Sequence, residues 1–494
     1  MTCRRWLVAA PDLSRGSRED LIWRRSLRVI LVSLTVASLA GTCSVVAHSR
    51  RNHSLEGPEF AGHRFIPHLD HTASTVVGEL NELLFELPPG SPLGFPASVF
   101  ASLDDMLAGA RVVGLGEATH GTVEFFELKH RLFRHLVEVH GHRALGYEFN
   151  FAGSLVLDRY VTTGEGSLDE ILAGVSWIQA NREVRALLEW MWEHNRGLAA
   201  EHRIHFVGID SQLDMWRVSL HREIFRDRFP ELEPALRTSF DELEALGKID
   251  YRALPWSEYD RIAGLLGAMA SIVDRRSTSL SREQHLVAAH LVEALERSHE
   301  FLFSAYQGDN NVRDPHLAEQ ALWIGELLGD GARYSIWAHN SHVGTNTHFH
   351  GDSGPGSMGV HLTRRLRKAY VRIATAFTRG SFVAVQGDWR GRDTTPMICR
   401  LASDPPSDSI NAILDRASTP RYLLNLRSIP RGSSLYRFLD AERPMLGVGD
   451  FFAGEIQPHY RGPTRITRLL DAFDAVFYFS DTKGVHPPAS NGTP

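Results

Sequence analysis

Short apolar runs of strand length alternate with amphipathic stretches of helix length, and this alternation constrains the fold more than any other feature. The clearest unit begins at residues 110–115, a run with a β-branched centre that leads into a glycine-rich polar loop, residues 116–121. From Val123 to His140, apolar residues recur at spacings of three and four, which predicts a helix with Thr122 as its amino-terminal cap. The core residues expected on this helix are Phe125, Leu128, Leu132, Leu136 and Val139.

Strand, loop and helix in this order form the repeating unit of a parallel sheet, so we predict an α/β fold. The sheet is expected to be mostly parallel and flanked by helices. Residues 213–332 show almost only helical spacing, which predicts an inserted helical subdomain packed over the sheet edge. Further expected strands are residues 143–149, 204–209, 334–338, 371–376, 422–426 and 475–479, and further expected helices are residues 71–87, 96–108, 182–200 and 283–306.

The first 50 residues carry the pattern of an export signal or a membrane anchor. A basic flank precedes an uncharged apolar run from Val29 to Ala47, which is longer than a usual signal core and close to the ~20 residues that span a bilayer. Positive charge on this flank predicts that the remainder faces away from the cytoplasm. We therefore expect residues 1–50 to be a signal peptide or membrane anchor and residues 51–494 to form one exported domain, periplasmic, extracellular or anchored to the membrane.

Charge and cysteine content narrow the range of partners. A net charge of −6 gives no bulk attraction to phosphate backbones, so we expect no nucleic-acid partner and favour chemistry on a small molecule. Of the three cysteines, Cys399 stands alone in the expected globular part. This excludes a disulfide scaffold and a cysteine-based zinc cluster there.

Ionisable residues follow three of the expected strands. The first strand runs into Glu117 and His120, the second ends at Glu148, and the third runs into His339 and His342. Because ligands of parallel α/β sheets bind outside the carboxyl ends of the strands, these carboxylates and imidazoles are expected to converge on one site. Three glycines in and around the first loop are expected to permit a tight turn that brings its two ionisable residues to the start of the helix; they are Gly114, Gly116 and Gly121.

These segments resemble the erythromycin esterase family, and the likeness runs over most of the chain after residue 70. It rests on Gly-Glu-Ala-Thr-His-Gly after a strand, on Glu148, and on Ala-His-Asn-Ser-His. The resemblance implies that His120 is the general base, that Glu117 and Glu148 are its paired acidic residues, and that His339 and His342 form a second histidine pair. Supporting segments are residues 181–184, 208–210, 313–314, 318–319, 358–359, 361–362 and 473–476.

One position departs from the family pattern. The family usually has an arginine nine residues after the first histidine, where this chain has Lys129, with Arg131 nearby. We expect Lys129, together with His339 and His342, to contact the substrate and to stabilise its oxyanion.

The chemistry of the residues agrees with the resemblance. A histidine with an ordinary pKa near ~6.5 can take a proton from water at neutral pH, which contributes roughly 10² to 10⁴ in rate. A neighbouring carboxylate, Glu117 or Glu148, would stabilise the imidazolium that forms at His120. We therefore expect hydrolysis of an ester or macrolide lactone, a reaction that confers antibiotic resistance, by direct attack of water without a cofactor or metal. No serine stands in a Gly-x-Ser-x-Gly elbow, so no acyl-enzyme is expected.

Two alternatives stay open. Two carboxylates and three histidines also suit a divalent cation, so the same residues could serve a metal-dependent hydrolase. The resemblance also permits a role in envelope polysaccharide biosynthesis, because some family members are described in that way and the amino terminus predicts export.

Overall fold

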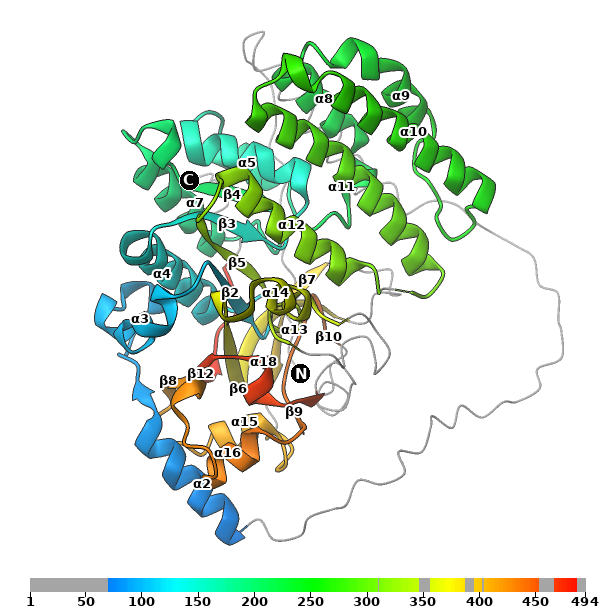
Figure 1. Ribbon diagram of the computed structural model, residues 1–494. Helices are drawn as coiled ribbons and strands as arrows, with labels where there is room; N and C mark the ends of the chain where they lie inside the picture. The colour runs from blue at the N-terminus through cyan, green and yellow to red at the C-terminus, as the bar shows by residue number, and fades with distance from the viewer. Residues whose placement is uncertain are drawn as a thin grey trace, which may run out of the picture.

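The protein is described by a computed structural model over residues 70–309, 311–345, 356–386, 395–401, 404–452 and 466–486 (Figure 1). The expected signal or anchor, Val29 to Ala47, lies outside these residues. Within them, no helix combines the length and the apolar character that crossing a membrane requires.

A 10-stranded mixed sheet forms the centre of the described part. Its strands are β1 (Phe85–Glu86), β2 (Val112–Glu117), β3 (His142–Tyr147), β4 (His205–Gly208), β5 (Arg333–His339), β6 (Tyr370–Gln386), β7 (Pro396–Leu401), β8 (Arg421–Asn425), β10 (Phe451–Phe452) and β12 (Ala475–Thr482). The order is β1-β8-β12-β6-β2-β5-β3-β4, with β7 and β10 paired to β6. Neighbours from β12 to β4 are all parallel, whereas β1, β8 and β7 pair antiparallel. The predicted, mostly parallel α/β sheet is therefore confirmed.

Helices flank the sheet, and alternate residues of a strand supply two separate cores. Val112 of β2 packs into one core, together with residues of the helix at 313–328, and Val113 packs into the other, together with residues of the helix at 123–140. This alternation is the period of two that a strand imposes on its side chains. The longer helices are α2 (Asp70–Leu83), α3 (Ala101–Ala108), α4 (Val123–His140), α5 (Phe151–Thr163), α7 (Arg182–Asn195), α8 (Val218–Arg228), α9 (Glu233–Ala245), α10 (Trp256–Arg275), α11 (Arg282–Tyr306), α12 (Arg313–Leu328) and α14 (Met358–Leu366).

The stretch between β4 and β5 is helical wherever the structure describes a regular element after residue 213. It begins with a 3-10 turn, Asp214–Arg217, and continues through α8 to α12. In Figure 1, α8 to α11 gather beyond α5 at the end of the sheet that β4 forms. The helical character matches the expectation from the sequence, while the division into a domain and an inserted subdomain stays a prediction.

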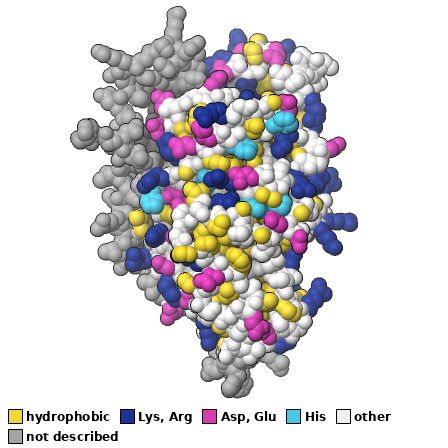
Figure 2. All heavy atoms as spheres, turned by 90° about the vertical axis from the view of Figure 1, so that its left-hand side faces the viewer, with side chains coloured by type: hydrophobic (Ala, Val, Ile, Leu, Met, Phe, Trp, Pro, Cys, Tyr) yellow, Lys and Arg dark blue, Asp and Glu magenta, His cyan; other side chains and the backbone are white. Residues whose placement is uncertain are grey.

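Helix α4 has the predicted bounds, but two of its details differ from the prediction. Val139, which was expected in the core, is 56% exposed. The buried residues of the last turn are Val137 and His140 instead. Thr122 occupies the cap position, yet its hydroxyl pairs with the Thr119 hydroxyl at 2.6 Å and makes no side-chain cap bond to the helix. On the face that carries α3 and α4, basic, acidic and histidine side chains are interspersed (Figure 2).

The glycines of the first loop are needed for a reason other than the predicted turn. None of the three has a positive φ, so a left-handed backbone does not require them. A Cβ at Gly116 would instead lie 2.3 Å from Asn340 Oδ1, and one at Gly121 would lie 2.0 Å from the Val383 carbonyl oxygen. Their role is to let neighbouring segments approach the loop that carries His120.

Gly121→Ala should therefore lower the melting temperature, because the added methyl group forces the backbone of β6 away at a cost of about 1–3 kcal/mol. The matched control is Gly264→Ala in α10, where a Cβ meets nothing within 4 Å. That change should be neutral or stabilising by up to about 1 kcal/mol, because alanine favours a helix interior. Thermal unfolding followed by circular dichroism measures both, and equal melting temperatures for Gly121→Ala and wild type would contradict the packing argument.

Candidate active site

Strand register brings the predicted residues together at one edge of the sheet. In the β2 and β5 pair Glu117 lies opposite His339, and on the other side of β5 the Glu148 N–H donates to the Trp337 carbonyl at 3.0 Å. His120 follows β2, and His342 lies in the short helix α13 (Asn340–Val343) that follows β5. Five of the six predicted site residues line one cavity of about 630 Å³, and Lys129 is the one that does not.

Glu117 is a buried carboxylate that three other side chains contact. One oxygen, Oε1, lies 2.6 Å from Nδ1 of His120. The other, Oε2, accepts from the Lys129 ammonium and, at 2.9 Å, from Nε1 of Trp337. Burial raises the pKa of Glu117, but the charge of Lys129 and the hydrogen bond from His120 lower it further than burial raises it. The group is therefore ionised in the resting site.

His120 is a strengthened base. Burial alone lowers the pKa of its imidazole, but the hydrogen bond to Glu117 and the negative charges of Glu148, Glu117 and Asp450 outweigh it and raise the pKa to about 9. With Nδ1 held by Glu117, Nε2 is the ring nitrogen left for a molecule in the cavity. The neighbouring ring of His339 has its centroid 5.3 Å away.

Lys129 lies behind Glu117 and does not line the cavity. Its ammonium sits 3.9 Å from the centroid of the Trp337 ring and forms the ion pair with Glu117. Burial outweighs the attraction of Glu117 and lowers the pKa of Lys129 to about 8. Arg131, the other basic residue near the family's arginine position, donates from Nε to the Phe95 carbonyl at 2.7 Å. Lys129 is thus the basic residue that contacts the Glu117 carboxylate.

A second charged cluster surrounds Glu148. Its Oε2 accepts from the His339 backbone N–H at 2.8 Å, and its Oε1 accepts from Nη2 of Arg313 at 2.9 Å. The same guanidinium nitrogen donates to Asp210 at 2.8 Å. Burial raises the pKa of Glu148, but the positive charges of His342, His120 and Arg313 lower it well below its usual range. Glu148 is therefore also ionised.

The pKa values of His339 and His342 are shifted in opposite directions. Nδ1 of His342 lies 2.8 Å from Asp314, and although burial lowers the pKa of His342, the charges of Asp314 and Glu148 raise it above its ordinary value. In contrast, burial and the positive charge of His120 lower the pKa of His339 to about 3. The Ser341 N–H donates to Nδ1 of His339 at 3.2 Å, which places the proton on Nε2, 3.4 Å from the Ala118 carbonyl oxygen. His339 is thus a neutral donor.

Sequence reasoning missed the residues that hold these groups. Arg313, Asp314 and Asp210 appeared only as segments of family resemblance, and Trp337 only as part of a strand. An acidic residue after β4 was the signal that could have identified Asp210, because it also lies at the carboxyl edge of the sheet. Other described residues of the cavity wall are Tyr147, Phe149, Asn150, Ser176, Ile178, Gln179, Gln212, Leu213, Arg217, Asn340, Ser341, Met445, Leu446, Gly447, Gly449, Asp450 and Phe473.

Two carboxylates of the cavity are paired with protein cations. Lys129 compensates Glu117, and Arg313 compensates Glu148. Over the described ranges, no three histidine, cysteine or acidic side chains of this cavity bring ligand atoms within 4.8 Å of one another. A divalent cation that binds Glu117 or Glu148 would therefore have to displace an existing ion pair.

Comparisons with known proteins point to one family. The family model for erythromycin esterase matches residues 137–482. Erythromycin esterase type II of Escherichia coli is 27% identical over 269 residues, which cover 49% of this chain and 63% of that protein. The putative hydrolase YbfO of Bacillus subtilis is 24% identical over 356 residues, which cover 64% of this chain and 74% of that protein.

Solved structures share the fold. A Bacillus cereus protein superposes with a TM-score of 0.70 at 22% identity, covering 84% of this chain and 99% of that one. A succinoglycan biosynthesis protein gives 0.66 at 24% identity, with coverage of 84% and 99%. A mutant of the erythromycin esterase EreC in its open conformation gives 0.60 at 18% identity, with coverage of 79% and 95%.

The ion pair behind the cavity predicts a non-additive stability effect. Lys129→Met removes the main compensating charge of a buried carboxylate and should cost up to about 3–5 kcal/mol of unfolding free energy. In the double variant Glu117→Gln/Lys129→Met the uncompensated charge is gone, so much of that stability should return. Urea unfolding of wild type, both single variants and the double variant measures the coupling, and strictly additive losses would show that the pair does not depend on mutual compensation.

Proposed function

Because the chain belongs to the erythromycin esterase family, we propose that it hydrolyses an ester or a macrolide lactone by histidine-assisted attack of water. The observation that carries the proposal is the pair of His120 and Glu117 at the cavity wall, with the carboxylate on Nδ1 and the opposite ring nitrogen available to the substrate. A carboxylate in this position sets the tautomer of a catalytic histidine and stabilises its protonated form.

In the proposed reaction, neutral His120 takes a proton from a water molecule as the water oxygen attacks the carbonyl carbon. The imidazolium that forms is stabilised by Glu117 and by the charge of Glu148, the same interactions that raise the pKa of His120. When the tetrahedral intermediate collapses, His120 returns the proton to the leaving alkoxide oxygen. The products are an acid and an alcohol, or a hydroxy acid from a lactone.

The remaining predicted residues receive separate proposed roles. Neutral His339 offers Nε2–H close to His120 and can donate to the developing oxyanion. His342 lies between Asp314 and Glu148, whose charges raise its pKa, and we assign it to substrate binding on the same wall. Lys129 acts on the substrate only through Glu117, so it is a positioning residue in this proposal.

The pH dependence tests the base directly. Only the neutral imidazole accepts a proton, so kcat/KM should rise about tenfold per pH unit at low pH and level off above about 9, the pKa of His120. Glu117→Gln removes the charge that raises this pKa, so the rising limb should move to lower pH while the plateau falls. An activity that decreases as pH rises through about 9 would show that protonated His120 is the active form, which contradicts its role as base.

His120→Ala should reduce kcat by at least ~10² in a folded protein, because the group acts mainly in the transition state. A matched control is His285→Ala, which removes another histidine paired with an acid, at 3.4 Å from Asp274 and remote from the cavity lining. Exhaustive chelation distinguishes this mechanism from the metal-dependent alternative. Wild-type hydrolysis should be unchanged after chelation if His120 is the base, and it should be lost if a metal activates the water. Activity of His120→Ala within about threefold of wild type would contradict both versions.

Substrate identity is tested by incubating purified protein with erythromycin and with simple aryl esters. Loss of intact erythromycin with a mass gain of one water, together with reduced macrolide susceptibility of an expressing host, is the expected result. Hydrolysis of the aryl esters without attack on erythromycin would support the proposed esterase activity but show that erythromycin is not the substrate. No hydrolysis of either class by a folded protein would contradict the proposed function and favour a role in envelope polysaccharide biosynthesis.

A further inference from the structure

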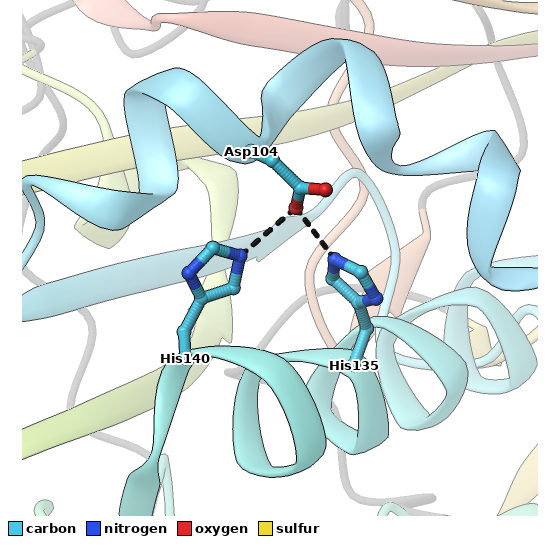
Figure 3. Close-up of side chains that lie close together, drawn as sticks. All are labelled: Asp104, His135 and His140. Carbon is cyan, nitrogen blue, oxygen red and sulfur yellow. Dashed lines mark hydrogen bonds and ion pairs between the residues drawn. The ribbon is translucent and has the colours of Figure 1, made fainter.

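A second cluster of ionisable side chains lies at the far end of α4 from the catalytic loop. Nε2 of His135 and Nε2 of His140 lie 2.7 Å and 2.9 Å from the same oxygen, Oδ1 of Asp104 (Figure 3). Among the described residues, this is the one group of three or more histidine, cysteine or acidic side chains whose ligand atoms all lie within 4.8 Å of one another. The proposed reaction uses none of the three.

We propose that Asp104, His135 and His140 form a binding site for a divalent transition-metal ion such as Zn²⁺. Two imidazole nitrogens and one carboxylate oxygen are a donor set that zinc and related ions prefer, and a water molecule completes a tetrahedral shell. Ligands at ~2.0–2.1 Å from a tetrahedral ion lie roughly 3.3–3.4 Å apart, so the two nitrogen–oxygen separations need to open by only about half an ångström.

The burial of the three residues suits an ion that enters from solvent. The side chains of His135 and His140 are 3% and 6% exposed, so their positions are set by packing, whereas that of Asp104 is 37% exposed. The donor atoms are therefore held in place by the fold, while the open side of Asp104 gives access to the ion without disturbing the core.

The surroundings limit how tightly the ion binds. A metal-bound histidine usually donates its second ring N–H to an acceptor, yet Nδ1 of His135 is buried without a partner in the described part of the chain. Arg333 brings a positive charge to the same junction, where it donates to the carbonyls of His140 and Ala108. These two features predict micromolar rather than nanomolar affinity.

The position of the cluster predicts a structural role. Asp104 belongs to the first turn of α3, and the two histidines belong to the last turns of α4, so one ion would join the two helices. Helix α4 has 18 residues and is about 27 Å long, and His120 precedes its first residue. An ion bound at the carboxyl-terminal end of α4 is therefore separated from His120 by most of the helix and cannot take part in the chemistry of the cavity. Its removal should lower the melting temperature but leave the hydrolysis rate unchanged.

The test is Zn²⁺ binding to the purified, metal-stripped protein by isothermal titration calorimetry, with bound metal counted by mass spectrometry. One ion per chain is expected, with a melting temperature that rises on addition. Loss of a residue that only hydrogen-bonds to a metal ligand typically weakens metal binding roughly 10- to 100-fold. Asp104→Asn and His140→Asn each remove a ligand itself, so each should weaken Zn²⁺ binding by at least that factor. Asp104→Asn keeps the proposal testable if the buried histidine variant does not fold, because Asp104 is partly exposed.

The matched control is His205→Asn, which breaks another histidine–aspartate contact, at 3.2 Å with Asp158, but no three-residue cluster. It should leave Zn²⁺ binding unchanged. Stoichiometric binding that is equal in wild type and in Asp104→Asn would place the ion elsewhere and overturn the proposal. Absence of binding to folded wild type at submillimolar Zn²⁺ would overturn it as well.

Discussion

The candidate site depends on keeping one buried carboxylate ionised. Glu117 is only 2% exposed, and a charge so buried persists only where donors and opposite charges compensate the lost hydration. The compensation comes from Lys129 on α4, Trp337 on β5 and His120 on the loop between β2 and α4. Three elements are thereby fixed around one strand end, and the imidazole that this carboxylate holds becomes a stronger base than a free histidine.

The two charged clusters of the cavity balance each other. In the resting site the first contains one carboxylate and two cations, Lys129 and protonated His120, and so carries an excess of positive charge. Around Glu148 and Arg313 carboxylates are more numerous, and Glu148 contributes to the raised pKa of His120 across the cavity. The proposed reaction starts from the neutral form of His120, and the proton that this ring would then accept is stabilised by charges that the fold holds fixed. Such electrostatic preorganisation lowers a barrier.

Periodicity predicted the parts of the fold that local sequence determines. Helix α4 and the strands around it follow from apolar spacing, and the strand ends then predicted that Glu148 and His339 would meet. Contacts between segments distant in sequence were not readable in this way, because no local pattern indicates that Arg313 reaches Glu148 or that Lys129 lies behind the cavity wall. Strand β6 was also longer than predicted, since its polar residues after Thr375 interrupt the apolar run while the backbone continues to pair with β7 and β10.

Part of the cavity wall comes from segments that belong to no strand of the sheet, near residues 176–179, 212–217 and 445–450. The acids and histidines, in contrast, stand at or just beyond strand ends and depend on strand register. Mutations that reshape these segments can therefore accumulate in a lineage without moving the acids and histidines. Descendants of one ancestral gene can in this way diverge in the molecules they admit while inheriting the same chemistry, which fits a family whose members share a fold at about 20% identity.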